Sequence, residues 1–217
     1  MKRFFLILAL IGFCIIFADA QTADADDNQS WNDVQITVPV NEQFDFTLAG
    51  TFRFGKNITR LNDRRIAVGF VYKPNKSWSF QPFYQHITAR NSAFKFRTEH
   101  RLNFRAIYKF PFKRFGLSHR SWVERRLREP RNSWRYRPSL TVEKDIGKIV
   151  SGAKVFATEE IFYDSVLKKF SRNRFSVGIT KTLTRKLSLD IFYLRQNDGF
   201  SRPGDLNVIG TSWKIKF

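Results

Sequence analysis

Residues 94–110, FKFRTEHRLNFRAIYKF, alternate between apolar and charged side chains over an unusual length. At about 100° per residue the apolar side chains would surround a helix, whereas at about 180° per residue they share one face, so the pattern predicts a strand. A strand in a soluble protein usually has about 5–6 residues. The apolar face of this much longer strand consists of Phe94, Phe96, Leu102, Phe104, Tyr108 and Phe110.

The same period of two recurs along the rest of the chain. Apolar side chains alternate in ten further segments, and turn residues separate the segments. No segment has a convincing helical period. The sequence therefore predicts eleven strands, in segments 34–40, 44–54, 66–72, 78–84, 94–110, 115–127, 134–142, 155–161, 175–179, 187–193 and 209–217.

The N-terminus has the features of a cleaved export signal. Lys2 and Arg3 precede an apolar run at 4–17, and Ala18-Asp19-Ala20 provides a small-residue cleavage site. Cys14, the only cysteine, lies inside this run, so the exported chain would contain no cysteine and would not be lipidated. We therefore expect a signal peptide at 1–20, a flexible acidic leader at 21–30 and a single β-barrel domain at 31–217.

Two architectures can use such amphipathic strands. A soluble sandwich turns its apolar faces inward, whereas a transmembrane barrel turns them toward lipid and its polar faces toward the lumen. The predicted strands can cross an apolar band of about 25 Å when tilted, and aromatic residues lie toward strand ends, where an interfacial girdle forms. We therefore expect an all-β fold, a transmembrane antiparallel up-and-down β-barrel of the outer-membrane type with about 10–12 strands, and keep a secreted basic β-sandwich as the alternative. The expected girdle residues are Trp31, Tyr72, Trp78, Tyr108, Trp134, Tyr163 and Trp213.

The predicted connections alternate in length. Short turns at one end and longer loops at the other are typical of outer-membrane barrels, in which the short turns face the periplasm and the strand number is even. Eleven strands do not fit an even number, so either the leader passes through the lumen or one strand is miscounted, and ten, eleven or twelve strands remain open. The short turns are expected at 41–42, 74–75, 111–112, 147–148 and 184–185, and the longer loops at 55–64, 88–93, 128–133, 164–171 and 197–205.

Several stretches resemble a bacterial family labelled domain of unknown function 2490. ERRLREPRNSWRYR (124–137) and YLRQNDGFSRPGDLNVIGTSWKIKF (193–217) are examples, and the resemblance extends over 31–217. It implies a barrel in the outer membrane of a Gram-negative bacterium and provides no catalytic residues. The chain's end also resembles the signal that the barrel-assembly machinery reads, which makes that machinery an expected partner. Its alternating positions are Ile209, Trp213, Ile215 and Phe217.

The charge of the chain is strongly positive. A formal net charge of +19 indicates a polyanionic partner such as nucleic acid, lipopolysaccharide or an anionic lipid surface. Export argues against nucleic acid, whose usual location is inside the cell. Basic loop residues could instead pair with lipopolysaccharide phosphates, or they could simply be solvated. These residues are Arg128, Arg131, Lys168, Lys169, Arg172 and Arg202.

The charged strand faces would line the lumen of the barrel. A barrel of 10–12 strands is only modestly wider than an eight-stranded one, whose interior side chains just fill it, so these residues could form a salt-bridged plug. They could equally form a narrow anion-preferring channel for a small anionic solute, since cations outnumber acids twelve to four. The expected lining is Arg53, Lys95, Arg97, Glu99, Arg101, Arg105, Lys109, Arg120, Glu124, Arg126, Arg135 and Arg137, together with Arg114, Glu143, Lys154 and Glu160. The leader acids Asp24, Asp26 and Asp27 could offset the surplus if they lie inside.

Catalysis is the less favoured function. Some outer-membrane acyl-ester hydrolases use serine, histidine and an acid on the lipid-facing wall. By their position in the alternation, His86, His100 and His119 would all face lipid, and Ser121 shares the face of His119. A tight turn at 111–113 would pair the two strands that flank it so that His100 lies opposite residues 123–125. No acid would then lie opposite His119. The sequence also contains no metal-ligand spacing or phosphate-binding loop, so we expect no cofactor. The favoured prediction is a non-enzymatic outer-membrane channel or binding barrel, and the alternative is a lipid-modifying barrel enzyme.

Overall fold

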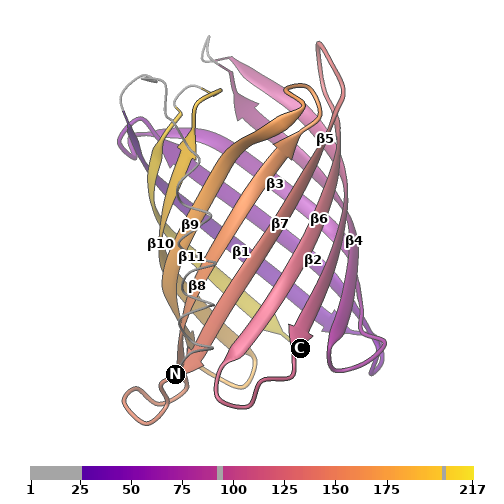
Figure 1. Ribbon diagram of the computed structural model, residues 1–217, viewed down its shortest axis with the longest axis vertical. Helices are drawn as coiled ribbons and strands as arrows, with labels where there is room; N and C mark the ends of the chain where they lie inside the picture. Colours follow the sequence, from indigo (N-terminus) through magenta and orange to yellow (C-terminus); the bar gives the residue numbers. More distant parts are fainter. Residues whose placement is uncertain (1–25, 92–94, 202–203) are drawn as a thin grey trace.

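The computed structural model describes residues 26–91, 95–201 and 204–217. These residues form eleven strands that close into one barrel (Figure 1). The expected signal peptide at 1–20, residues 21–25 of the expected leader, Phe94 and Arg202 lie outside the described residues. The strands are β1 (Asp27–Pro39), β2 (Phe44–Gly55), β3 (Arg60–Tyr72), β4 (Trp78–Arg90), β5 (Phe96–Phe110), β6 (Gly116–Leu127), β7 (Ser133–Asp145), β8 (Ala153–Asp164), β9 (Lys169–Thr182), β10 (Leu187–Asp198) and β11 (Leu206–Lys216).

An odd strand number determines how the barrel closes. Sequential strands pair antiparallel, so the first and the eleventh strand run in the same direction and must pair in parallel. This parallel seam runs from Asp27 opposite Leu206 to Thr37 opposite Lys216. The all-β barrel is confirmed, and all eleven predicted strands are present in the described chain. Eleven is one of the three strand numbers that the sequence left open, and it departs from the even number typical of outer-membrane barrels.

The predicted difference in length between the connections at the two rims of the barrel is absent. The lower rim in Figure 1 carries connections 40–43, 73–77, 111–115, 146–152 and 183–186, and the upper rim carries 56–59, 91–95, 128–132, 165–168 and 199–205. Both sets range from four to seven residues. The strands continue into segments that the sequence predicted to be loops, and β1 begins inside the expected leader, at Asp27. Connection length therefore gives no orientation in the membrane.

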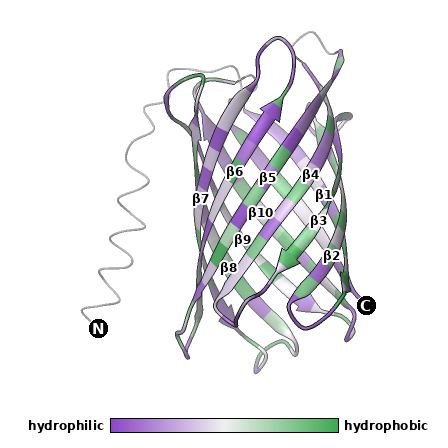
Figure 2. Ribbon diagram, turned by 90° about the vertical axis from the view of Figure 1, so that its right-hand side faces the viewer, coloured by the Kyte–Doolittle hydropathy of each residue, from purple (hydrophilic) through white to green (hydrophobic). Residues whose placement is uncertain are grey.

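The two faces of the wall differ in polarity. Apolar side chains such as Ile66, Leu102 and Ile209 point outward and are more than half exposed, and apolar and polar residues alternate along each strand (Figure 2). Aromatic rings stack on the outer wall near the lower rim, from Tyr72 through Phe80 and Trp78 to Tyr108. Such a girdle is typical of a membrane interface. In the described part of the chain, no helix is long and apolar enough to cross a membrane.

A small apolar core lies inside the barrel, against the parallel seam. It consists of Trp31, Leu194, Leu206 and Val208, with Phe192 packed against it. The Phe192 ring lies directly over Gly210, where any Cβ would collide with it. Trp31 is only 4% exposed, so its assignment to the outer girdle is wrong: its odd position on β1 turns it into the lumen.

Candidate functional site

Most of the expected lining residues lie inside the barrel. They come from β2, β5, β6, β7 and β8, where their positions alternate with outward residues that are mostly apolar. The buried or half-buried members are Arg53, Glu99, Arg101, Arg105, Arg120, Glu124, Arg126, Arg135, Arg137 and Glu160. The exposed members lie at the ends of strands or in connections, and these are Lys95, Arg97, Lys109, Arg114, Glu143 and Lys154.

A layer of packed side chains crosses the middle of the lumen. The indole of Trp122 lies between two guanidinium groups, with Arg105 Cζ 3.8 Å and Arg137 Cζ 3.7 Å from its ring. Its Nε1 donates to Oδ1 of Asn103 at 3.0 Å. Such cation–π contacts are strongest when water is excluded, and Trp122 is only 7% exposed. We call Asn103, Arg105, Trp122, Glu124, Arg137 and Glu160 the central layer.

Two carboxylates of the central layer fix the position of Arg137. Glu124, 0% exposed, accepts from Arg137 Nη1 at 2.6 Å, and Arg101 lies 3.5 Å away. Glu160 accepts from Arg137 Nη2 at 2.8 Å and also pairs with Arg120. A buried charge is tolerated only when it is paired and hydrogen-bonded. The layer therefore depends on mutual pairing of its own charges.

Other inward carboxylates were missed by the sequence analysis. Asp63 pairs with Arg65, Asp164 with Arg135 and Asp198 with Arg172. All six residues belong to β3, β7, β8, β9 and β10, and the three acids fall in segments that were predicted to be loops. The twelve-to-four ratio of lumen cations to acids is therefore too high. Arg172 was expected in a basic loop, but it points inward to Asp198.

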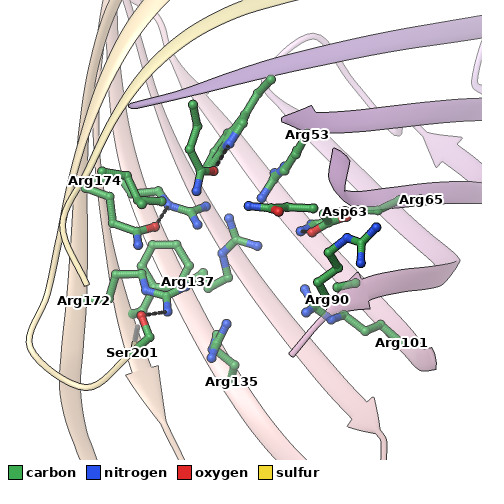
Figure 3. A pocket seen from close by; sticks show the side chains of 17 residues that line it. Arg53, Asp63, Arg65, Arg90, Arg101, Arg135, Arg137, Arg172, Arg174 and Ser201 are labelled. Carbon is green, nitrogen blue, oxygen red and sulfur yellow. Dashed lines mark hydrogen bonds and ion pairs between the residues drawn. The ribbon is translucent and has the colours of Figure 1, made fainter. Parts of the chain in front are cut away.

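A cavity of about 220 Å³ lies within the upper half of the lumen, next to the central layer. Figure 3 shows guanidinium groups pointing into it from several sides. Eight arginines and one carboxylate, that of Asp63, belong to its described lining. Gln29, Gln196 and Asn62 add neutral hydrogen-bonding groups. The lining arginines are Arg53, Arg65, Arg90, Arg101, Arg135, Arg137, Arg172 and Arg174.

Arg53 is the lining residue whose charge is least compensated by contacts. Its guanidinium lies 3.6 Å from the ring of Trp31, and it makes no ion pair with a described carboxylate. Nε of Arg53 and Nε of Arg135 are buried without a hydrogen-bond partner. Arg174 donates to Gln196 at 2.8 Å and lies 3.9 Å from Glu160. Guanidinium donors of this kind bind carboxylate and phosphate oxygens well.

A second cavity, of about 390 Å³, lies toward the lower rim. Lys73, Lys76, Lys109 and Asp45 are among its lining residues, and Lys73 Nζ donates to Asp45 at 2.8 Å. It shares no lining residue with the arginine cavity. The central layer lies at mid-height, between these two cavities.

The histidines lie on the outer wall. His119 Nε2 is 3.1 Å from Ser121 Oγ, and Ser121 Oγ is 3.1 Å from the hydroxyl of Tyr136. His119 is opposite Tyr108 and Leu140. His100 is opposite Leu127, slightly beyond the predicted 123–125. Within the described residues, no group of three or more histidine, cysteine or acidic side chains could hold a metal ion.

The residues of the expected assembly signal lie on β11 and at the chain's end. Ile209, Trp213 and Ile215 share the outward phase of the strand. Phe217 is 62% exposed, and its backbone N donates to Thr37 O at 3.1 Å. The last residues of the chain are thus held by the parallel seam.

The fold and the lumen together define a class of protein. A closed barrel with an apolar outer wall and a charged, packed interior is a transmembrane β-barrel of the outer-membrane type. The sequence profile of the family described as "Protein of unknown function (DUF2490)" matches residues 28–207. The chain belongs to this family, which confirms the resemblance seen in the sequence.

Solved structures of porins are similar to this barrel. The "NanC porin structure in rhombohedral crystal form" has a TM-score of 0.50 at 14% identity, over 89% of this chain and 100% of that one. The "Anion-selective porin from Comamonas acidovorans" has a TM-score of 0.41 at 12% identity, over 81% of this chain. This chain spans 54% of that porin's length. Likenesses at such low identity concern the fold alone, and no curated protein matches significantly.

Proposed function

We propose that this protein is a non-enzymatic outer-membrane barrel that takes small anionic solutes into its lumen, as a binding barrel or a narrow anion-preferring channel. One observation carries the proposal: eight arginines and one carboxylate line a cavity of about 220 Å³ inside the wall. Arginine-lined constrictions favour anions in pores, and charge-assisted hydrogen bonds to guanidinium are stronger than neutral ones. The solute class is therefore a small phosphate- or carboxylate-bearing molecule.

The central layer favours binding over free passage. Arg101 and Arg137 line the cavity and also hold Glu124. An anion that enters would compete with this carboxylate for the same guanidinium groups. Passage to the lower cavity then requires the layer to rearrange, so we expect the resting conductance of the barrel to be low.

Planar-bilayer recording and phosphate titration of the wild type and of the double variant Arg53→Ala/Arg174→Ala test the proposal. The purified barrel is expected to bind inorganic phosphate, and the double variant should bind it at least tenfold more weakly, since the loss of even one charge-assisted hydrogen bond costs roughly 1.5 kcal/mol. Any residual current of the wild type should be anion-selective. Lys148→Ala/Lys186→Ala removes the same charge from lower-rim connections and is the matched control. Equal phosphate affinity and equal ion selectivity in all three proteins would contradict the proposed binding of anions in the lumen.

A second candidate function rests on the contact of 3.1 Å between His119 Nε2 and Ser121 Oγ. Such a pair on a lipid-facing wall could attack an acyl ester, with histidine taking the serine proton. The orienting partner of a triad is missing, because His119 hydrogen-bonds no carboxylate or amide in the described chain. Incubation with phospholipid or lipopolysaccharide is the test: release of fatty acid by wild type and not by Ser121→Ala would favour it. No release by wild type removes it.

A further inference from the structure

The lower cavity, of about 390 Å³, is larger than the arginine cavity and is separate from it. Its lining comes from the lower ends of β1 to β5 and from connection 73–77. It shares no lining residue with the arginine cavity, and the central layer lies between the two. Neutral hydrogen-bonding side chains face it from β1 and β4, and these are Gln35, Thr37, Ser79 and Gln81.

Two lysines of this lining have no charged partner. Lys76 in connection 73–77 and Lys109 at the lower end of β5 are exposed, and neither ammonium group makes an ion pair or hydrogen bond with a described residue. Lys73 differs, because its Nζ donates to both carboxylate oxygens of Asp45, at 2.8 and 2.9 Å. Three lysines against one carboxylate leave the described lining with two uncompensated positive charges.

The lack of a partner is a property of these two positions. Lys154 and Lys214 also occupy inward positions in the lower half of their strands, on β8 and β11. Lys214 Nζ lies 2.5 Å from Asp190, and Lys154 Nζ lies 3.7 Å from Glu143. The chain thus supplies a counter-charge for both of these lysines and supplies none for the two free lysines of the lower cavity.

The upper end of the lower cavity adjoins a third cation without an ion pair. Gln81 is opposite Arg105 in the pairing of β4 with β5, and Ile107 is the next inward residue below Arg105. The Arg105 guanidinium stacks on Phe83 and Trp122, makes no ion pair with a described residue, and has a buried Nε without a hydrogen-bond partner. Attraction between charges extends beyond contact where water is partly excluded. An anion in the lower cavity would therefore be stabilised from both ends.

From this geometry we infer that the lower cavity is a second anion site, entered from the lower rim and formed by Lys76 and Lys109. Its ligand is a small phosphate- or carboxylate-bearing solute. A free solute is favoured over a lipid headgroup because the lining residues face the lumen and not the apolar outer wall. An ammonium group is a strongly hydrated point charge without the bidentate geometry of guanidinium, so this site binds more weakly than the arginine cavity. The inference goes beyond the proposed function, since either site can bind without the other.

Calorimetric titration of the detergent-solubilised barrel with inorganic phosphate counts the sites. Wild type is expected to bind two phosphates with unequal affinities. Lys76→Gln/Lys109→Gln should weaken the weaker site about tenfold, the effect of losing roughly one charge-assisted contact, and should leave the tighter site unchanged. Arg53→Ala/Arg174→Ala should weaken the tighter site and leave the weaker one. Failure of the proposed function and failure of this inference therefore affect different sites and are distinguishable.

A matched control separates the cavity from the general charge of the rim. Lys148→Gln/Lys186→Gln removes the same charge from lower-rim connections outside the cavity lining and should keep both sites. Lys76→Arg/Lys109→Arg keeps the charge and should retain the weaker site. If the glutamine pair fails to fold on heat-mobility gels, Lys76→Gln alone carries the test, because Lys76 lies in a connection and not in a strand.

Three results would overturn the inference. The first is a wild type that binds a single phosphate, lost with the arginine pair. The second is equal affinity of the weaker site in wild type and in the glutamine pair of the cavity. The third is an equal loss in both glutamine pairs, which would mean that the whole lower rim attracts phosphate and that the cavity has no special role.

Discussion

Arg137 and Glu124 form the shortest ion pair of the central layer, with Nη1 2.6 Å from Oε1. Both residues are buried: Glu124 is 0% and Arg137 is 6% exposed. We predict that Glu124→Ala destabilises the folded barrel by about 3–5 kcal/mol, because the variant leaves buried guanidinium charge uncompensated. Urea-induced unfolding in detergent, followed by tryptophan fluorescence, measures the change. Arg137 keeps Glu160 as a partner, so the lower end of the range is expected.

An exposed ion pair provides the control for this prediction. Lys154 Nζ is 3.7 Å from Glu143, and both side chains are about half exposed. Solvated pairs contribute about 0–1 kcal/mol. Glu143→Ala should therefore change the unfolding free energy by less than about 1 kcal/mol. Similar losses for Glu124→Ala and Glu143→Ala would show that burial does not matter here.

Trp122 gives a prediction about conductance. Its indole fills the space between Arg105 and Arg137, and truncation to alanine would remove the largest apolar group of the central layer. We predict that Trp122→Ala raises single-channel conductance several-fold above wild type and lowers stability by about 3–5 kcal/mol. Trp134→Ala is the matched control, because Trp134 lies on the outer wall and is 49% exposed. Unchanged conductance in folded Trp122→Ala would mean that this layer does not obstruct the lumen.

The alternation of residue type made the strands and their faces predictable. A period of two assigns each side chain to one face without knowledge of its neighbours. This is why Arg101, Glu124 and Arg137 could be placed inside the barrel from sequence. Each of them has an outward apolar or aromatic neighbour on its own strand, and these neighbours are Leu102, Val123 and Tyr136.

The upper ends of the strands were not predictable in the same way. Outward positions there carry polar residues such as Asn173, Asn197 and Asn207, which hydrogen-bond with neighbours on the outer wall. With both faces polar, the apolar alternation disappears, and these segments look like loops. The acids Asp164 and Asp198 lie in such segments, so the charge balance of the lumen was misjudged. The parallel seam depends on strands 179 residues apart in sequence, which no local pattern indicates.

The orientation of the barrel can be tested by cysteine labelling. The only cysteine is Cys14, in the expected signal peptide, so an introduced cysteine would be unique in the exported chain. Val166 lies in an upper-rim connection and is 40% exposed, whereas Ile149 lies in a lower-rim connection and is 84% exposed. We predict that a membrane-impermeant maleimide labels Val166→Cys in intact cells and labels Ile149→Cys only after the outer membrane is opened. The reverse pattern would place the lower rim outside.

The role of Phe217 as an assembly signal can be separated from any structural role. Its side chain is 62% exposed, and only its backbone is hydrogen-bonded to β1. Phe217→Ala should therefore change the unfolding free energy of refolded protein by no more than about 0.5 kcal/mol. In cells we predict several-fold less folded barrel in the outer-membrane fraction, measured as the heat-modifiable band, because the assembly machinery would bind the variant poorly. Phe170→Ala removes an equally exposed phenyl group at the upper rim and should assemble normally. Equal amounts of both folded variants would mean that the terminal aromatic group is not read.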